Sequence, residues 1–376
     1  MMTGVWTDLV GQERVAELFD RAAKGAMTHA WLVTGPPGSG RSTAAVAFAA
    51  ALQCVSNGCG ECKDCRMVFE GTHSDVTVID TEGLSIGVDV ARDIVRKAAM
   101  YPAVGGWQVI IVEDADRLTE QAANALLKSI EEPSPNTVWL LCAPFAEDVL
   151  VTIRSRCRHV VLTTPSVTDV ARFLVRKEGI DEPTARAIAS ATQGHIGRAR
   201  ALAKDPEARE RRREIASIPI ELRSLEGVMS AAERIVAEAQ ARSASLCDEL
   251  DVKELGDLRT SWGVEDKGKR PSGYAGALST LTKEQESRRK RIARDEIDRV
   301  LLELMSVLRD VLTVQLGVDG ELINLDLAVG ATDLANRTTS GKTLDSLEAI
   351  TQCRNALLAN AAPQIAMERM FLRMVS

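Results

Sequence analysis

The stretch Gly35-Pro36-Pro37-Gly38-Ser39-Gly40-Arg41-Ser42 decides the fold of this chain. It meets the phosphate-loop pattern G-x-x-x-x-G-K-[ST] at every fixed position except the lysine, where Arg41 stands. In such loops backbone N–H groups approach phosphate oxygens, and the positive end of the next helix dipole adds to the attraction. Arginine is planar and forked whereas lysine is a compact charge, so the exchange is not conservative. Weak binding of ATP or ADP with Mg²⁺ and a plain connector without ligand both stay open.

The length and composition describe a globular protein with room for two or three domains. The chain has 376 residues, of which 45% are hydrophobic and 26% charged, and a formal net charge of −7. This charge argues against the whole molecule being a polyanion binder but allows a local basic patch. No apolar run approaches the roughly 18–20 residues of a membrane span, and the N-terminal stretch lacks the pattern of a secretory signal. We therefore expect a cytoplasmic protein without membrane contacts.

Four cysteines, Cys54, Cys59, Cys62 and Cys65, lie close together with the spacing C-x4-C-x2-C-x2-C. Disulfides are rare in the cytoplasm, so another role is expected. Two overlapping C-x-x-C pairs with a fourth thiolate suit a tetrahedral Zn²⁺ site, and four protein ligands leave no open position for water. The predicted zinc is therefore structural. An iron–sulfur cluster and a redox-active thiol pair remain alternatives.

The first 160 or so residues alternate short apolar runs with helical patterns, which is typical of βαβ units. The runs are nearly continuous, as expected of parallel strands buried on both faces. The phosphate loop joins the first run to a predicted helix at Ser42–Leu52, and the cysteine cluster follows that helix. The five predicted strands are Ala30–Thr34, Val76–Asp80, Gln108–Glu113, Val138–Cys142 and His159–Leu162.

The remaining residues have mainly helical patterns. Pro165-Ser166 opens a helix, and Asp181–Ala203 has the pattern of two more. Arg288–Leu316 is the longest helix candidate, and its first four residues are expected to be a solvated basic face rather than a DNA contact. Residues 251–279 are predicted to form a loop or a partly disordered excursion.

Four short motifs resemble the signatures of the clamp-loader AAA+ ATPases of bacterial DNA polymerase III. They are Leu9–Gln12 (LVGQ), His29–Leu32 (HAWL), Asn124–Pro133 (NALLKSIEEP) and Thr152–Cys157 (TIRSRC). The placement of the cysteine cluster also matches. The resemblance spans roughly residues 5–205 and returns near Pro363–Arg369. It implies an α/β RecA-like AAA+ domain with the zinc module over 1–163, a helical lid over 164–205 and an all-α collar domain for oligomerisation over 206–376.

The family's acidic pair is altered here. The resemblance implies an aspartate that holds magnesium and a following glutamate that activates water, but this chain has Glu113-Asp114, the inverse order. One methylene too many and one too few move the carboxylates by about an ångström or more, which can cost on the order of 100-fold in rate. Two solvated acids at a strand end are the alternative interpretation.

Two further active-site positions also depart from the family. The polar residue expected after the fourth strand falls at Ala143 or Pro144, and the lid arginine is replaced by Gly197, with Arg198 one place away. Together with Arg41 and the inverted acids, these changes resemble the non-motor delta-prime subunits more than the gamma/tau motor subunits. A gamma/tau-type subunit with its own ATPase activity is the alternative, and an unrelated nucleotide- or DNA-binding module with the same fold is a third reading.

Arg156 is retained in the Ser-Arg-Cys motif. The resemblance implies that this residue is an arginine finger, offered to the ATP of a neighbouring subunit. A surface arginine, or one in an intrachain ion pair, is the alternative. A finger supplied in trans contributes roughly 10³–10⁵ in turnover. The resemblance further implies gamma/tau and delta subunits in a hetero-oligomeric ring, the sliding clamp and primer-template DNA as partners.

Overall fold

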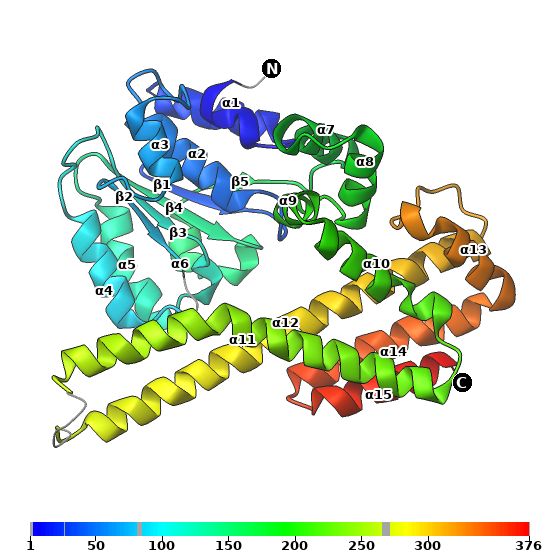
Figure 1. Cartoon of the computed structure of the whole chain (residues 1–376). Helices are drawn as coiled ribbons and strands as arrows, with labels where there is room; N and C mark the ends of the chain where they lie inside the picture. The colour runs from blue at the N-terminus through cyan, green and yellow to red at the C-terminus, as the bar shows by residue number, and fades with distance from the viewer. Residues whose placement is uncertain (1–2, 26, 81–84, 265–270, 376) are drawn as a thin grey trace. The chain divides into compact units, whose positions relative to one another are not determined.

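The chain forms two compact units, Met1–Asp205 and Pro206–Ser376. A computed structural model describes residues 3–25, 27–80, 85–264 and 271–375. The first unit contains a five-stranded sheet with helices, and the described part of the second unit is helical (Figure 1). None of the helices in the described ranges has the length and apolar character required to cross a membrane.

The sheet of the first unit is parallel, with the strand order β2-β3-β4-β1-β5. The strands are β1 (Ala30–Thr34), β2 (Val76–Ile79), β3 (Gln108–Val112), β4 (Thr137–Ala143) and β5 (Arg158–Val161). All five predicted strands are confirmed, with bounds that differ by one residue at most. Because β1 lies between β4 and β5, the phosphate loop that follows it is flanked by strands on both sides. It lies at the carboxyl ends of the strands, where α/β folds bind ligands.

Helices cover both faces of this sheet, and three more follow it. The elements of the unit besides the strands are η1 (Gly4–Asp8), α1 (Glu13–Ala23), α2 (Arg41–Gln53), α3 (Lys63–Phe69), α4 (Val88–Ala98), η2 (Ala115–Arg117), α5 (Glu120–Glu131), η3 (Ala146–Asp148), α6 (Val151–Arg154), α7 (Val167–Glu178), α8 (Glu182–Ala191) and α9 (Ile196–Lys204). The helix after the phosphate loop and the three helices after Pro165 are close to their predicted positions.

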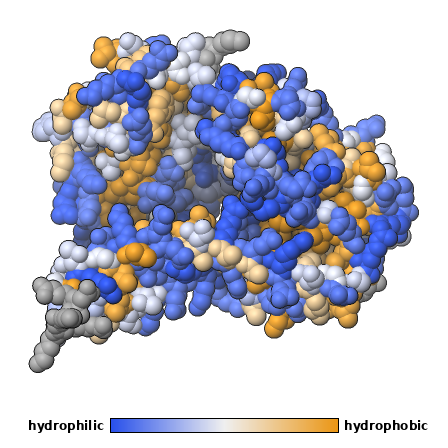
Figure 2. All heavy atoms as spheres, viewed as in Figure 1, coloured by the Kyte–Doolittle hydropathy of each residue, from blue (hydrophilic) through white to orange (hydrophobic). Residues whose placement is uncertain are grey.

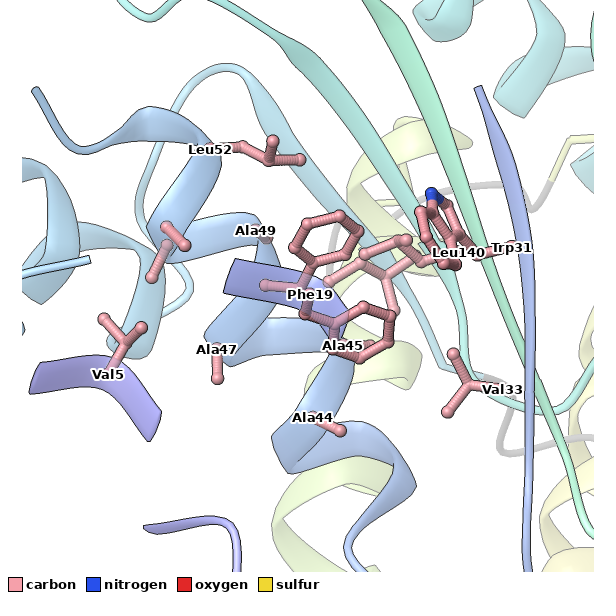
Figure 3. Packing of buried hydrophobic residues seen from close by; sticks show 14 of the residues in the cluster. Val5, Phe19, Trp31, Val33, Ala44, Ala45, Ala47, Ala49, Leu52 and Leu140 are labelled. Atoms are coloured by element: carbon pink, nitrogen blue, oxygen red, sulfur yellow. The ribbon is translucent and has the colours of Figure 1, made fainter. Parts of the chain in front are cut away.

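Both faces of the central strands are buried, which explains their continuous apolar sequences. Trp31 of β1 packs with α1 and α2 on one face, whereas Leu32 packs with α4 and α5 on the other. On the first face Phe19 stacks on Phe48, with 4.4 Å between ring centroids, and meets Trp31 edge-on at 5.4 Å. Figure 3 shows Phe19 and Trp31 in this cluster. Burying each such side chain contributes about 1.5–3 kcal/mol.

A buried carboxylate fixes the loop before β3. Asp75 is 2% exposed and accepts hydrogen bonds from the backbone N–H groups of Ala103, Val104 and Gly105 at 2.7, 2.8 and 2.6 Å. Burial by itself raises the pKa of Asp75, but these donors outweigh it and hold the pKa below its ordinary value. The ionised side chain therefore stabilises the folded loop.

Replacing Asp75 by asparagine should lower the free energy of unfolding by about 2–3 kcal/mol near neutral pH, because an amide nitrogen would face backbone donors. Since the folded pKa lies below the unfolded one, the carboxylate's contribution is complete above the unfolded value of about 3.9 and is lost as pH falls through the folded pKa. Denaturant unfolding of both proteins between about pH 7 and 3 measures this. Asp93→Asn, on the exposed side of α4, is the control. If the difference in free energy of unfolding between the unaltered protein and Asp75→Asn stayed the same in acid, the stabilising role of the Asp75 carboxylate would be contradicted.

The second unit is built from helices α10 (Pro206–Glu221), α11 (Leu225–Ser261), α12 (Tyr274–Gln315), η4 (Leu325–Leu327), α13 (Ala328–Arg337), α14 (Ser340–Leu358) and α15 (Pro363–Val375). The predicted excursion at 251–279 is wrong for most of its length, since α11 continues to Ser261 and α12 begins at Tyr274. Residues 265–270 of that prediction lie outside the described residues.

Ion pairs between α11 and α12 explain this difference. Arg288 binds Glu254, with Nη1–Oε1 at 2.8 Å, and also Asp251. These contacts, opposed by burial, raise the pKa of Arg288, and Arg288 lowers the pKa of Glu254. Arg289 also pairs with Asp251. The first part of the basic run is therefore engaged within the chain rather than a solvated face, which local sequence patterns cannot predict.

Candidate functional site

The phosphate loop is closed by the start of α9. Gly38 has φ +84°, and a Cβ at this position would lie 2.3 Å from the ring of His195. His195 caps α9 by accepting a hydrogen bond from the N–H of Arg198 at 3.2 Å, and Ile196 N–H donates to the Gly38 carbonyl at 3.3 Å. Only glycine fits this close approach of α9 and the loop. No sequence motif identifies His195 as part of the site.

Gln12 connects the loop to the chain that follows β5. Its side-chain amide donates to the carbonyls of Ser39, at 3.4 Å, and Thr163, at 2.6 Å. Gln12 is 4% exposed, so both contacts are shielded from water. The LVGQ motif therefore holds the phosphate loop in place, a role that its spacing did not reveal.

Arg41 begins helix α2, and its guanidinium donates to the carbonyl of Gly35 in the same loop. The family's lysine reaches the phosphates from this position. Here the side chain at this position is hydrogen-bonded to the loop's own backbone. The exchange of lysine for arginine leaves the backbone N–H groups of the loop unchanged, and such groups are what a phosphate loop directs at phosphate oxygens.

Ser42 and Glu113 face one another, as a magnesium site would require, but they are hydrogen-bonded directly to each other. The Ser42 hydroxyl donates to Glu113 Oε2 at 2.6 Å. Burial raises the pKa of Glu113, and the nearby carboxylates of Asp80 and Asp114 add to this against the Ser42 hydrogen bond. Burial also raises the pKa of Asp114, although Arg117 opposes the shift. The site thus brings together acidic groups whose charge a divalent cation could neutralise. Glu113, which has the longer side chain, stands first in the acidic pair, and Asp114 stands second.

The end of β4 places an apolar residue beside the loop. Ala143 is fully buried and is paired in register with Thr34, the last residue of β1. Its methyl group cannot form a hydrogen bond with a phosphate. Gly197, in the first turn of α9, likewise carries no side chain. The structure therefore brings Gly35–Ser42 together with Glu113 but supplies no polar side chain from Ala143 or Gly197.

The four cysteines form a compact cluster that could hold a metal ion. Their Sγ atoms all lie within 4.8 Å of one another. Cys54 Sγ lies 3.6 Å from that of Cys59 and 3.8 Å from that of Cys62. Four thiolates around one ion with bonds of about 2.3 Å would be about 3.8 Å apart, so the geometry fits a single tetrahedral ion.

Backbone N–H groups support these sulfur atoms. The N–H groups of Cys59, Cys62 and Cys65 each approach the preceding cysteine sulfur of the cluster at 3.4 Å. Burial raises the pKa of Cys54, but backbone N–H groups, with that of Cys59 first, outweigh it and lower the pKa to about 6. Burial raises the pKa of the Cys65 thiol instead. Such N–H···S contacts orient metal ligands in thiolate sites.

Arg156 lies on the surface, in the turn between α6 and β5. Its side chain is 36% exposed and forms an ion pair with Glu131 at the end of α5. Its Nη1 also donates to the carbonyl of Thr152 at 2.7 Å. In the single chain Arg156 is therefore accessible but engaged within the protein.

The sheet separates Arg156 from the phosphate loop of the same chain. Arg158 begins β5 and is paired with Trp31 near the start of β1, whereas the loop follows Thr34 at the end of β1. Since the strands are parallel, the start of β5 and the phosphate loop lie at opposite ends of the strands. The four residues from Trp31 to Gly35 separate them by about 13 Å along the strand direction. Arg156 and the chain's own loop are not brought together.

Two protein-family models match parts of this chain. Residues 11–166 match the model described as DNA polymerase III, delta subunit, and residues 290–375 match the one described as DNA polymerase III, delta subunit, C terminal. Together they cover more than half of the chain. The first match contains the phosphate loop, the cysteine cluster and Arg156.

Individual relatives are similar mainly over the same region. The chain is 37% identical over 172 residues to DNA polymerase III subunit delta' of Haemophilus influenzae, covering 45% of this chain and 52% of that protein. It is 39% identical over 154 residues to the delta' subunit of Pseudomonas aeruginosa, covering 39% and 47%. It is 33% identical over 197 residues to the tau subunit of Bacillus subtilis, covering 50% and 35%. The chain thus spans about half the length of the delta' relatives it matches.

Among solved structures, a DNA polymerase III gamma subunit-related protein of Thermotoga maritima aligns with 96% of this chain and 98% of its own length. Its sequence identity is 17% and the TM-score is 0.42. The Bacillus subtilis clamp loader delta protein aligns with 96% of this chain and 99% of its own, at 13% identity and a TM-score of 0.33.

Proposed function

Because this chain belongs to the DNA polymerase III delta-subunit family, we propose that it is a non-motor subunit of a clamp loader, the delta-prime type of that complex. In this proposal it lends Arg156 to a neighbouring ATP site and hydrolyses little or no ATP itself. The observation that carries the proposal is the position of Arg156 near the amino-terminal ends of the strands, whereas the chain's own phosphate loop follows the carboxyl end of β1. An arginine in that position can serve only a nucleotide bound to another subunit.

The weak ion pair that Arg156 forms within the chain allows it to change partners. Its present partner Glu131 is 41% exposed, and an ion pair at this exposure contributes about 0–1 kcal/mol. A γ-phosphate held at a desolvated subunit interface would accept two charge-assisted hydrogen bonds from the same guanidinium. Exchange of Glu131 for a neighbour's phosphate is therefore inexpensive, and the intrachain pair keeps the arginine ordered until a neighbour is present.

The chain's own nucleotide site is proposed to be degenerate. Arg41 is hydrogen-bonded to the Gly35 carbonyl of the loop, and Glu113 is hydrogen-bonded to Ser42. Ala143 has no side-chain group that could contact a phosphate. Since the loop N–H groups remain, weak binding of ATP or ADP with Mg²⁺ is compatible with this proposal. Productive hydrolysis would require a correctly placed lysine and water-activating acid.

The isolated chain should hydrolyse ATP no faster than about 10⁻³ per second, because the groups that stabilise the transferring phosphoryl are missing. Arg41→Ala should leave this background rate unchanged. Phosphate release with primed DNA present measures both proteins, and preparing them side by side controls for contaminating ATPases. Turnover well above the background that is abolished by Arg41→Ala would favour the alternative, a gamma/tau-type subunit with its own ATPase activity.

We propose Zn²⁺ as the ion of Cys54, Cys59, Cys62 and Cys65, with a structural role. Four sulfur atoms as close as 3.6 and 3.8 Å suit one ion, whereas a cluster of several irons needs thiolates spread around a larger body. The ion would tie the end of α2 to the start of α3, since Cys54 follows the first and Cys62 caps the second. The loop also contacts the N-terminal segment, because Val5 N–H donates to Gly58 O at 3.0 Å.

The partners follow from the family. We propose gamma/tau and delta subunits in a hetero-oligomeric ring, the sliding clamp and primer-template DNA, with a cytoplasmic location. In domain terms we propose an AAA+ domain over 1–163, a lid over 164–205 and an oligomerising collar over 206–376. The packing of Val10 into the hydrophobic core formed by α7, α8 and α9 supports a lid that responds to the loop region.

A further inference from the structure

Two apolar grooves flank the turn between α14 and α15 in the second unit. The first has a volume of about 580 Å³ and lies between this turn and the helices α11 and α12. The second, of about 320 Å³, lies between α14 and α15. Both are lined in part by Ala361 and Ala362, so the turn forms a ridge between them. Figure 1 shows α14 and α15 side by side at the end of the chain.

The charged side chains that line these grooves are all basic. None of the described residues that line either groove is acidic, whereas five carry positive charge. They are Arg289, Lys290, Arg294, Arg369 and Arg373. Arg289 is neutralised by Asp251, but Lys290 and Arg369 form no ion pair within the described part of the chain. The grooves therefore keep a positive rim in a protein of net charge −7.

Two of the arginines are held by neutral groups. Arg294 donates to Asn360 Oδ1 at 2.8 Å, and Arg373 donates to Gln352 Oε1 at 2.7 Å. An amide oxygen orients a guanidinium without neutralising its charge. Both arginines thus remain available to an anionic group while their direction is fixed, which reduces the entropy lost on binding.

Large apolar side chains protrude beside the same turn. Leu358 at the end of α14 is 70% exposed, and Ile365 at the start of α15 is 67% exposed. Apolar residues also reach the surface elsewhere among hydrophilic ones (Figure 2), but here Ile365 lines the second groove, and Leu358 follows Leu357, which lines the first. Contiguous exposed apolar surface with a polar rim is typical of protein interaction sites.

We propose that the surface around the α14–α15 turn is a docking site for an acidic, amphipathic peptide segment of a partner protein. The apolar side chains of that segment would fill the two grooves, and its carboxylates would face Lys290, Arg294, Arg369 and Arg373. A nucleic acid fits less well, because none of the described residues that line either groove is aromatic and able to stack on a base. This site takes no part in the proposed ATP chemistry, and it lies in the unit that the proposed function assigns to oligomerisation.

The test uses the full chain and a fluorescein-labelled helical peptide of about twelve residues that alternates pairs of leucine and glutamate. Fluorescence anisotropy should give a dissociation constant in the micromolar range. Lys290→Glu should weaken binding at least about fivefold through loss of charge complementarity. Lys283→Glu is the matched control, because Lys283 is also an exposed lysine of α12 but lines neither groove. Peptides with glutamine for glutamate, or serine for leucine, should bind at least about fivefold more weakly than the parent.

Several results would overturn the proposal. Equal loss of binding in Lys290→Glu and Lys283→Glu would mean that the peptide responds only to overall charge. Displacement of the peptide by a single-stranded oligonucleotide at lower concentration than by unlabelled peptide would identify a nucleic-acid surface. Concentration-dependent dimerisation that Lys290→Glu abolishes, measured by analytical ultracentrifugation, would identify a second copy of the chain as the occupant.

Discussion

Replacing Arg156 by alanine should lower ATP hydrolysis at the neighbouring site of the assembled, DNA-stimulated complex by about 10³-fold or more. In this proposal the guanidinium stabilises charge that develops on the γ-phosphate, and alanine supplies no group in its place. Assembly should be unaffected, because the side chain is partly exposed and its ion pair with Glu131 contributes little to stability. Steady-state phosphate release by the reconstituted complex, with assembly checked by gel filtration, measures the effect.

Three variants separate this role from a structural one. Arg156→Lys keeps the charge but loses the bidentate geometry, so it should rescue only a small part of the rate. Glu131→Gln frees the arginine from its intrachain partner and should leave turnover intact or raise it. Arg21→Ala, on the exposed face of α1, is the control for loss of a surface arginine. Unchanged turnover in Arg156→Ala would remove the assignment of the arginine finger.

Replacing Cys59 and Cys62 together by serine should release about one zinc ion per chain and destabilise the first unit by at least about 3 kcal/mol. These two cysteines are the more exposed members of the cluster, so the substitutions themselves disturb little packing. For a unit of this size the loss corresponds to a fall in melting temperature of roughly 6–12 °C. Elemental analysis of the purified protein and thermal unfolding measure the two effects.

Cys157→Ala is the matched control, because it removes a partly buried thiol that lies outside the cluster. It should retain the full zinc content, and a strong chelator should destabilise it as much as it destabilises the unaltered protein. Iron in place of zinc, or carefully prepared protein without metal and with undiminished stability, would contradict the assignment of the site.

The parts of the fold that depend on local sequence could be predicted. The five strands are short apolar runs bounded by polar or glycine-rich segments, and their positions follow from that pattern. The phosphate loop and the four cysteines are close in sequence, so their spacing alone predicts a local site. Two of the three helices after Pro165 begin at recognisable caps, Ser166 and Asp181; the Ser166 hydroxyl accepts from Asp169 N–H at 3.1 Å, and the Asp181 carboxylate accepts from Thr184 N–H at 3.1 Å.

The contacts that the sequence did not reveal join residues far apart in the chain. The continuation of α11 and α12 depends on Arg288 meeting Asp251, a pair separated by 37 positions. The close approach of His195 to the loop depends on how α9 packs, and the pairing of Arg156 with Glu131 depends on how α5 and α6 meet. Propensity and periodicity describe neighbours in sequence and carry no information about such long-range pairs.

The most direct test of the central claim is a structure of the assembled complex with a non-hydrolysable ATP analogue and primed DNA. The account predicts that Arg156 has left Glu131 and that its guanidinium lies within about 3 Å of a γ-phosphate oxygen on the adjacent subunit. An Arg156 that still pairs with Glu131, with the neighbour's nucleotide completed by a different residue, would contradict it.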